Sequence, residues 1–167
     1  MTSPSRSLQI ALVLAFVSTA AFAHGTESHS KPAQQRAGPG EQKAFGIAGN
    51  PARVTRTIDV RMTDQMRFEP AVINVREGET IRFRNANVGK VMHEMVIGTR
   101  AALEQHATLM RKFPEMEHDE PHMVHVAPGR KGELIWHFNR SGEFEFACLI
   151  PGHFEAGMRG LINVAAK

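Results

Sequence analysis

The chain has 167 residues and a formal net charge of +3 at pH 7, with charges of both signs interspersed along it. This length suits one domain with its own core, and the near-balanced charge gives no basis for nucleic-acid binding. A single cysteine excludes an intramolecular disulfide framework, while nine histidines and nine methionines stand beside one tryptophan and no tyrosine.

The N-terminus has the pattern of a secretory signal peptide. Arg6 supplies a positive charge, residues 8–17 are mostly apolar, and Ala21-Phe22-Ala23 places small residues where a signal peptidase reads. The apolar run is too short for a permanent membrane anchor. We therefore expect residues 1–23 to be removed, with cleavage after Ala20 as the alternative, which leaves a periplasmic protein without a membrane anchor.

The next segment, residues 24–52, is rich in Gly, Pro, Ser, Gln and Ala and has few large apolar residues. Such a segment buries too little surface to offset its ordering entropy, so we expect a flexible arm that contains histidines. From residue 53 onward, β-branched and aromatic residues alternate with polar ones in short runs. Strands are expected within residues 54–62, 71–75, 76–85, 91–98, 132–138, 142–148 and 160–166.

One helix is expected between these strands, from a cap at Thr99 to Phe113, where apolar residues recur at helical spacing and Pro114 ends the pattern. Many short strands with one helix in a long connection predict an all-β fold. We expect residues 53–167 to form a Greek-key β-sandwich or barrel.

The chemistry is concentrated in "FACLIPGHFEAGMRG", residues 146–160, which contains the only cysteine. Cys148, His153 and Met158 follow an expected strand on one short loop. A thiolate and two imidazoles with a weaker axial thioether are the ligands of a mononuclear copper site. The loop supplies one imidazole, so a distant histidine is required, and His93 in "KVMHEMVIG" is the best candidate.

Other interpretations of this loop remain open from the residues alone. A lone buried cysteine is usually an inert small hydrophobe, and a methionine ten residues later usually packs in the core. A catalytic Cys–His pair would need an orienting partner or an oxyanion site, and neither is evident. Zinc prefers a closed tetrahedral site without a thioether.

The segments "MRFEPAVINVREGETIRFRN", "HEMVI" and "CLIPGHFEAGM" resemble, in order, the strand, first-ligand and ligand-loop segments of the cupredoxins, the blue-copper family. The spacing Cys-x4-His-x4-Met is similar to the rusticyanin type of loop. This resemblance implies a type 1 copper site with His93, Cys148 and His153 as equatorial ligands and Met158 as axial ligand. Glu94 is a departure, because an Asn or Ser follows the first histidine in several electron carriers of the family.

In this interpretation copper cycles between Cu(II) and Cu(I), and the ring edge of His153 is the expected point of electron entry. A redox partner protein is expected to dock near His153. The apolar residues beside it could equally serve only to shield the copper from water.

Further histidines and methionines are candidates for accessory copper sites. Imidazoles mixed with carboxylates suit Cu(II), and thioethers suit Cu(I). If cleavage follows Ala23, His24 offers both its α-amine and its imidazole. The loop "MEHDEPHMVH" mixes histidines and methionines with carboxylates. The alternative is that the arm is a solvated tail and that this loop is an ordinary polar surface loop. The accessory candidates are His24, His29, Met116, His118, His122 and His125.

Two functions are compatible with the sequence. The histidine-led arm, the His/Met loop and Glu94 favour a periplasmic protein of copper tolerance or homeostasis, and the whole resembles small cupredoxins linked to bacterial copper resistance. The core site alone favours a diffusible one-electron carrier between respiratory partners. An enzyme ranks third, because multicopper oxidases and copper nitrite reductases use His-x-His pairs and the sequence has none. Oxidation of Cu(I) to Cu(II) at the core site stays open.

Overall fold

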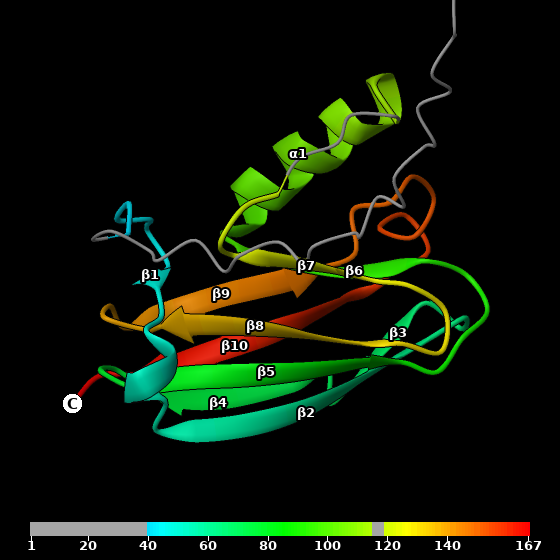
Figure 1. The fold of residues 1–167 in the computed structure, drawn as a ribbon. Helices are drawn as coiled ribbons and strands as arrows, with labels where there is room; N and C mark the ends of the chain where they lie inside the picture. The colour runs from blue at the N-terminus through cyan, green and yellow to red at the C-terminus, as the bar shows by residue number, and fades with distance from the viewer. Residues whose placement is uncertain (1–39, 115–118) are drawn as a thin grey trace, which may run out of the picture. The chain divides into compact units, whose positions relative to one another are not determined.

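The computed structural model describes residues 40–114 and 119–167, which lie in one unit, Arg36–Lys167. Within these residues the strands form two five-stranded sheets (Figure 1). The first sheet contains, in spatial order, β1 (Ile47–Ala48), β8 (Lys131–His137), β5 (Thr80–Asn87), β2 (Arg56–Thr63) and β3 (Arg67–Glu69). The second sheet contains β4 (Val72–Arg76), β10 (Arg159–Ala165), β9 (Gly142–Ala147), β6 (His93–Gly98) and β7 (Met123–Val126).

The core lies between the two sheets, as the alternation of side chains along the strands requires. In β5, Ile81 and Phe83 are fully buried, whereas Arg84 points to the other face and pairs with Asp59 of β2. Most strand pairs are antiparallel, but β2 pairs with β5 in parallel, and β10 pairs with β4 in parallel. The predicted all-β sandwich with one helix in a long connection is therefore confirmed.

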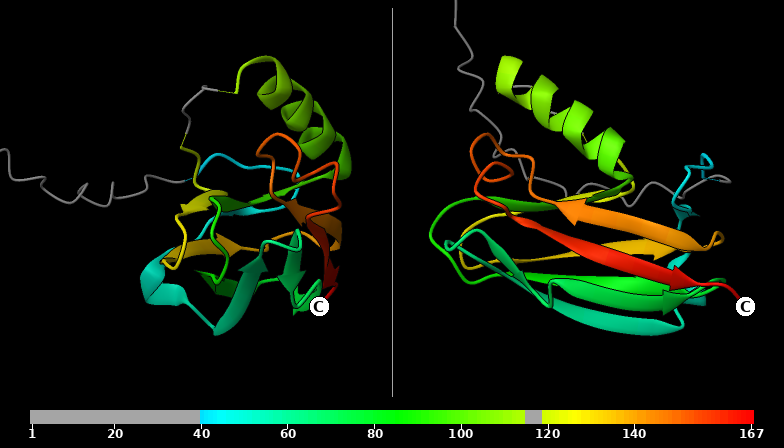
Figure 2. Two further views of the ribbon diagram at one scale, coloured as in Figure 1. Left: turned by 90° about the vertical axis from the view of Figure 1, so that its right-hand side faces the viewer. Right: turned by 180° about the vertical axis from the view of Figure 1, so that it is seen from behind.

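The helix α1 (Arg100–Lys112) connects β6 to β7 and covers the outer face of the second sheet, on the side away from β2 (Figure 2). Thr99 caps it by accepting a hydrogen bond from the backbone N–H of Ala102. Its buried residues pack against Val96 of β6 in a second apolar cluster. The helix therefore covers Val96 from outside, while Met95 and Ile97 face the core between the sheets, and all six residues of β6 are buried. Among the described residues, no helix combines the length and hydrophobicity needed to cross a membrane.

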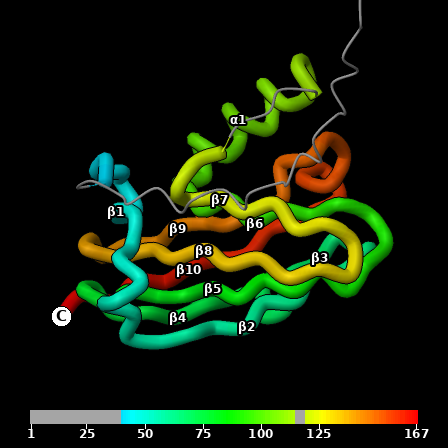
Figure 3. The backbone as a smooth tube through the Cα atoms, in the orientation of Figure 1, coloured from blue at the N-terminus to red at the C-terminus, as the bar shows by residue number. Residues whose placement is uncertain are grey.

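The connections that carry the candidate metal ligands meet at one end of the sandwich. The loop between β9 and β10 lies at the same end as the connection between β5 and β6, opposite the C-terminus (Figure 3). Residues 55 positions apart in sequence are thereby brought together, as the hydrogen bond from the Leu149 backbone N–H to Glu94 Oε1 shows.

Residues 40–52 differ from the sequence expectation, which placed them in a flexible arm. Here β1 pairs with β8, and Phe45 is only 5% exposed and stacks on Trp136 with ring centroids 5.3 Å apart. The Trp136 indole N–H also donates to the Phe45 carbonyl oxygen at 2.9 Å. Gly46 has a φ of 128°, and a Cβ there would overlap the His137 carbonyl oxygen. Phe45 and Gly46 therefore help to fix this segment on the sheet. The average composition of residues 24–52 does not reveal the effect of these two residues.

The polar segment before β8 also differs in part from expectation. The sequence pattern predicts a loop over "MEHDEPHMVH", but Met123–Val126 forms β7, in which His125 lies opposite Glu94 of β6. Met123 and Val126 are buried in this short strand. The short edge strands β1, β3 and β7 were the ones missed, because two to four residues carry too little alternation to be recognised.

Candidate metal centre

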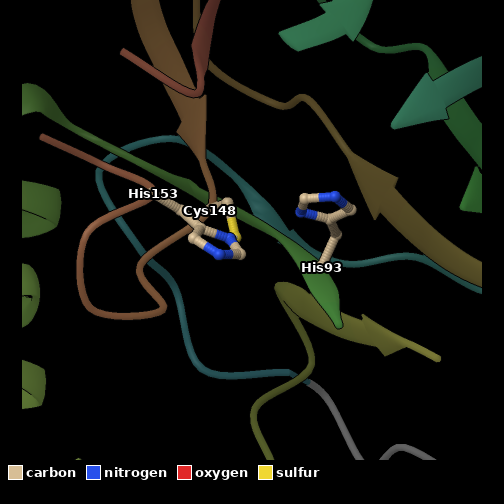
Figure 4. Close-up of side chains that lie close together, drawn as sticks. All are labelled: His93, Cys148 and His153. Carbon is tan, nitrogen blue, oxygen red and sulfur yellow. The ribbon is translucent and has the colours of Figure 1, made fainter. Parts of the chain in front are cut away.

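Three side chains converge at the loop end of the sandwich. His93 begins β6, Cys148 follows β9, and His153 lies in the next loop (Figure 4). One ligand atom from each lies within 4.8 Å of the others, and among the described residues this is the only such group of three or more His, Cys, Asp and Glu side chains. His93 and Cys148 have no exposed surface, while His153 is half-buried.

The loop between β9 and β10 is folded back by its own backbone. The Cys148 N–H donates to the Met158 carbonyl oxygen at 3.0 Å, and the Met158 N–H donates to the His153 carbonyl oxygen at 3.0 Å. Gly152 and Gly157 allow the tight path because both have positive φ angles, of 89° and 87°. The sequence spacing of Cys, His and Met is thereby converted into proximity in space.

The segment that leads into His93 is organised by the buried side chain of Asn87. Its amide donates to the carbonyl oxygens of Val91 at 2.7 Å and Val126 at 2.8 Å. Its Oδ1 accepts from the Gly89 N–H at 2.9 Å. These bonds fix the turn between β5 and β6 and so set where His93 enters the site.

The ring nitrogens of both histidines are oriented for a metal ion. His93 Nδ1 is buried and has no hydrogen-bond partner, whereas His93 Nε2 lies 3.2 Å from Asp64 Oδ1. His153 Nδ1 lies 3.3 Å from Cys148 Sγ. A buried polar atom without a partner is costly, so the orphaned His93 Nδ1 fits a site completed by a metal ion.

Burial keeps two of the three donors, the Cys148 thiol and the His153 imidazole, neutral in the metal-free protein. Burial raises the pKa of the Cys148 thiol to about 12, so this group is protonated at neutral pH. Burial lowers the pKa of His153, and the neighbouring His93 acts in the same direction. The imidazole of His153 is therefore unprotonated, and a metal ion that binds must displace the thiol proton.

The donor chemistry selects the metal. A thiolate and two imidazoles suit copper or zinc and do not suit magnesium or calcium. Met158 has no exposed surface, belongs to the same core cluster as Cys148 and is joined to it by a backbone hydrogen bond, so the loop also carries a buried thioether. A thioether near a Cys–His₂ set is a feature of copper sites rather than of structural zinc sites.

Glu94 is a charged residue buried beside the candidate ligands, with only 1% of its surface exposed. Its Oε1 accepts a hydrogen bond from the Leu149 N–H at 2.7 Å, and its Oε2 lies 2.7 Å from His125 Nε2. The Glu94 carboxylate is the main reason that the pKa of His125 is raised above its ordinary value. Glu94, which replaces the Asn or Ser of several electron carriers, therefore links β6, β7 and the loop between β9 and β10.

The accessory copper candidates that the structure describes have other neighbours. His122 is half-buried with its ring against Phe45 and Trp136, at centroid distances of 5.4 and 6.0 Å. His125 pairs with Glu94. The other candidates, His24, His29, Met116 and His118, lie outside the described residues.

Sequence reasoning found the three converging residues but missed Asp64, whose carboxylate contacts His93. Asp64 lies 29 residues before His93, in the turn between β2 and β3, and it belongs to no motif. Only the parallel pairing of β2 with β5 places this turn beside the segment that precedes β6.

Comparison with known proteins assigns the chain to one family. Residues 54–165 match the family of copper binding proteins described as the plastocyanin/azurin family. The chain is 54% identical to the copper-resistant cuproprotein CopI of Rubrivivax gelatinosus over 120 residues, which cover 72% of this chain and 73% of that protein. It is 34% identical to CopI of Pseudomonas aeruginosa, with 79% of this chain and 88% of that protein covered.

Solved structures show the same fold at lower identity. Auracyanin B is 19% identical with a TM-score of 0.60 and covers 76% of this chain and 97% of its own. The auracyanin of Roseiflexus castenholzii is 19% identical with a TM-score of 0.58 and covers 67% of this chain and 98% of its own. The chain therefore belongs to the plastocyanin/azurin family of copper binding proteins, the cupredoxins, and its cofactor is copper.

Proposed function

We propose that the protein is a periplasmic type 1 copper protein that acts in copper tolerance. His93, Cys148 and His153 are the equatorial ligands in this proposal, and Met158 is the axial ligand. The observation that carries it is the buried His–Cys–His group within a chain that is 54% identical to a protein named for copper resistance. The signal-peptide pattern of residues 1–23 supports export to the periplasm.

Bound copper would supply one-electron chemistry between Cu(II) and Cu(I). The burial of each proposed ligand indicates its further role. Cys148 and His93 are fully buried, which excludes water from the side of the site that they form. His153 is half-buried and lies on the loop, so its ring edge is the route from the surface to the centre. Ligands fixed by the fold limit the geometry change between the two copper states.

The accessory sites belong to the same proposal. His24, His29, Met116, His118, His122 and His125 are the candidates for additional copper. His122 is the described residue that best retains this role, because its Nδ1 is buried without a hydrogen-bond partner and burial lowers its pKa. A neutral imidazole with an unused nitrogen can bind a metal ion. His125 is the weaker candidate, because Glu94 already engages it.

A second function, diffusible electron transfer between respiratory partners, is favoured by one surface feature. Val91 and Met92, which directly precede His93, are each 43% exposed. They lie in the connection that enters His93, and the rings of His93 and His153 have centroids 5.0 Å apart. The two apolar residues are therefore at the ligand-bearing end of the domain. Such a surface could receive a partner protein near His153.

Growth on copper tests the proposed function. A strain that lacks the gene should become copper-sensitive, and the wild-type gene should restore growth while Cys148→Ser should not. Full restoration by Cys148→Ser would refute a role for the core site in tolerance. Normal copper tolerance of the deletion strain, with impaired respiratory electron flow, would favour the electron carrier instead. Copper stoichiometry of the purified mature protein tests the accessory sites, because a strict single copper per chain would contradict them.

A further inference from the structure

Asp64 is a carboxylate that contacts a ligand of the copper site from outside. It lies in the turn between β2 and β3, and its Oδ1 is 3.2 Å from His93 Nε2. The side chain of His93 has no exposed surface, whereas that of Asp64 is 39% exposed. The pair therefore joins a buried ligand to a charge at the protein surface.

This contact determines which nitrogen of His93 carries the proton. A carboxylate accepts hydrogen bonds, so the Nε2 that faces Asp64 is the protonated nitrogen of a neutral imidazole. The other nitrogen, Nδ1, then has a free lone pair, and it is the buried atom without a partner at the copper site. Asp64 thus selects the tautomer that can bind copper.

Asp64 is itself held in place by the backbone that precedes His93. Its Oδ2 accepts a hydrogen bond from the Lys90 N–H at 2.7 Å, and its Oδ1 lies 3.4 Å from the Val91 nitrogen. A Cβ at Gly89 would overlap Asp64 Oδ1, so only glycine allows this close approach. These two backbone contacts and the contact to His93 hold the carboxylate in one position against the ligand.

We propose that Asp64 is a positioning residue of the copper site, which fixes the tautomer of His93 and whose charge biases the bound metal toward Cu(II). This inference rests on the proposed role of His93 as a ligand. A carboxylate partner makes an imidazole a stronger donor, and a fixed negative charge stabilises the more highly charged metal state. The centre is therefore biased toward holding copper in its oxidised form.

A purely structural role for Asp64 predicts a different result. Its bonds to Lys90 and Val91 also shape the turn before His93, so its loss would lower stability in either case. The equilibrium between Cu(II) and Cu(I) distinguishes the two roles, because a change in stability shared by both copper states leaves the potential unchanged.

The test compares Asp64→Asn with Asp59→Asn. Asp59 lies on β2, five residues before Asp64, is exposed and pairs with Arg84 at 2.7 Å, so its substitution removes the same charge without touching His93. Redox titration of the copper-loaded proteins, followed by visible absorption, measures the ratio of Cu(II) to Cu(I) affinity. We expect Asp64→Asn to decrease this ratio by about tenfold or more, which raises the potential by about 59 mV per factor of ten. Asp59→Asn should leave it unchanged.

A second readout does not depend on copper. Nitrogen-15 NMR of the metal-free wild-type protein should show His93 protonated at Nε2 and unprotonated at Nδ1. A proton on Nδ1 in the wild type would overturn the proposal even if Asp64→Asn failed to fold. Equal potentials for Asp64→Asn, Asp59→Asn and the wild type would also overturn it. If His93→Ala left the copper spectrum unchanged, the ligand assignment itself would fail, which separates that outcome from failure of the inference about Asp64.

Discussion

Glu94 Oε1 accepts a hydrogen bond of 2.7 Å from the backbone N–H of Leu149, the residue that follows Cys148. Glu94 also follows His93, so one buried side chain links the neighbours of two proposed copper ligands. Its other oxygen contacts His125 of β7 at 2.7 Å. The spacing between β6 and the ligand loop is therefore held by a carboxylate with partners on both sides.

Removal of this bridge should loosen the ligand loop. Glu94→Ala leaves the Leu149 N–H buried without an acceptor, which should lower the free energy of unfolding of the copper-free protein by about 1–3 kcal/mol. Glu94→Gln keeps an acceptor oxygen of the same reach and should cost less. Hydrogen exchange at the Leu149 amide checks the cause, since it should accelerate in Glu94→Ala and remain slow in Glu94→Gln. Unchanged protection in Glu94→Ala would show that the bond does not hold the loop.

His125 should make the stability of the copper-free protein depend on pH. Glu94 raises the pKa of His125 above its ordinary value, and Asp119 adds in the same direction, although partial burial opposes them. A raised pKa in the folded state contributes stability that is fully present below about pH 6.5 and is lost as pH rises through the folded-state value.

The melting temperatures of the wild type and His125→Asn should therefore differ more at pH 5.5 than at pH 9. The comparison within each pH cancels the contributions of the other titrating groups. An equal difference at both pH values would show that the charge on His125 does not contribute.

Phe45 should anchor the N-terminal segment on the sandwich. It is 5% exposed and packs against Trp136, so Phe45→Ala should lower the free energy of unfolding by about 3–5 kcal/mol. Phe113→Ala is the matched control, because Phe113 at the end of α1 is 57% exposed and its loss should change stability by less than about 0.5 kcal/mol. Denaturant unfolding measures both. If both substitutions changed the free energy of unfolding only slightly, Phe45 would not anchor residues 40–52, and the flexible arm expected from composition would be supported.

The two histidines proposed as copper ligands should respond differently to added imidazole. His153 is half-buried on a loop, so His153→Gly should open its coordination position to solvent and free imidazole should restore the visible spectrum. His93 is fully buried, so His93→Gly should not be rescued. Titration of the two copper-loaded variants with imidazole measures this contrast. Rescue of both variants would show that the buried position is open to solvent.

Much of the fold could be predicted because long strands carry a strong alternation. In β5, Ile81 and Phe83 face the core while Arg82 and Arg84 face away, and the pattern alone predicts this. Segment 43–48 could not be found in this way, since its attachment depends on contacts with β8 that are distant in sequence, such as the stack and hydrogen bond between Phe45 and Trp136, 91 residues apart. Its average composition is that of a flexible chain.

In the candidate site, too, some residues could be predicted from the sequence and others could not. Cys148 and His153 lie on one loop and could be predicted from their spacing and chemistry, and His93 could be predicted from its strand context. The partners of these residues could not. Asp64 reaches His93 through the pairing of β2 with β5, and His125 reaches Glu94 through the pairing of β7 with β6. Both contacts depend on strand register, which a single sequence does not specify for a short or distant strand.

The central claim is that the thiolate of Cys148 binds copper. The most direct test is the visible and electron paramagnetic resonance spectrum of the copper-loaded protein, compared between the wild type and Cys148→Ser with the copper content of each measured. We expect the wild type to show an intense visible band that Cys148→Ser lacks, while any copper at accessory sites remains bound. Persistence of the intense band in Cys148→Ser, or its absence from the copper-loaded wild type, would contradict this assignment.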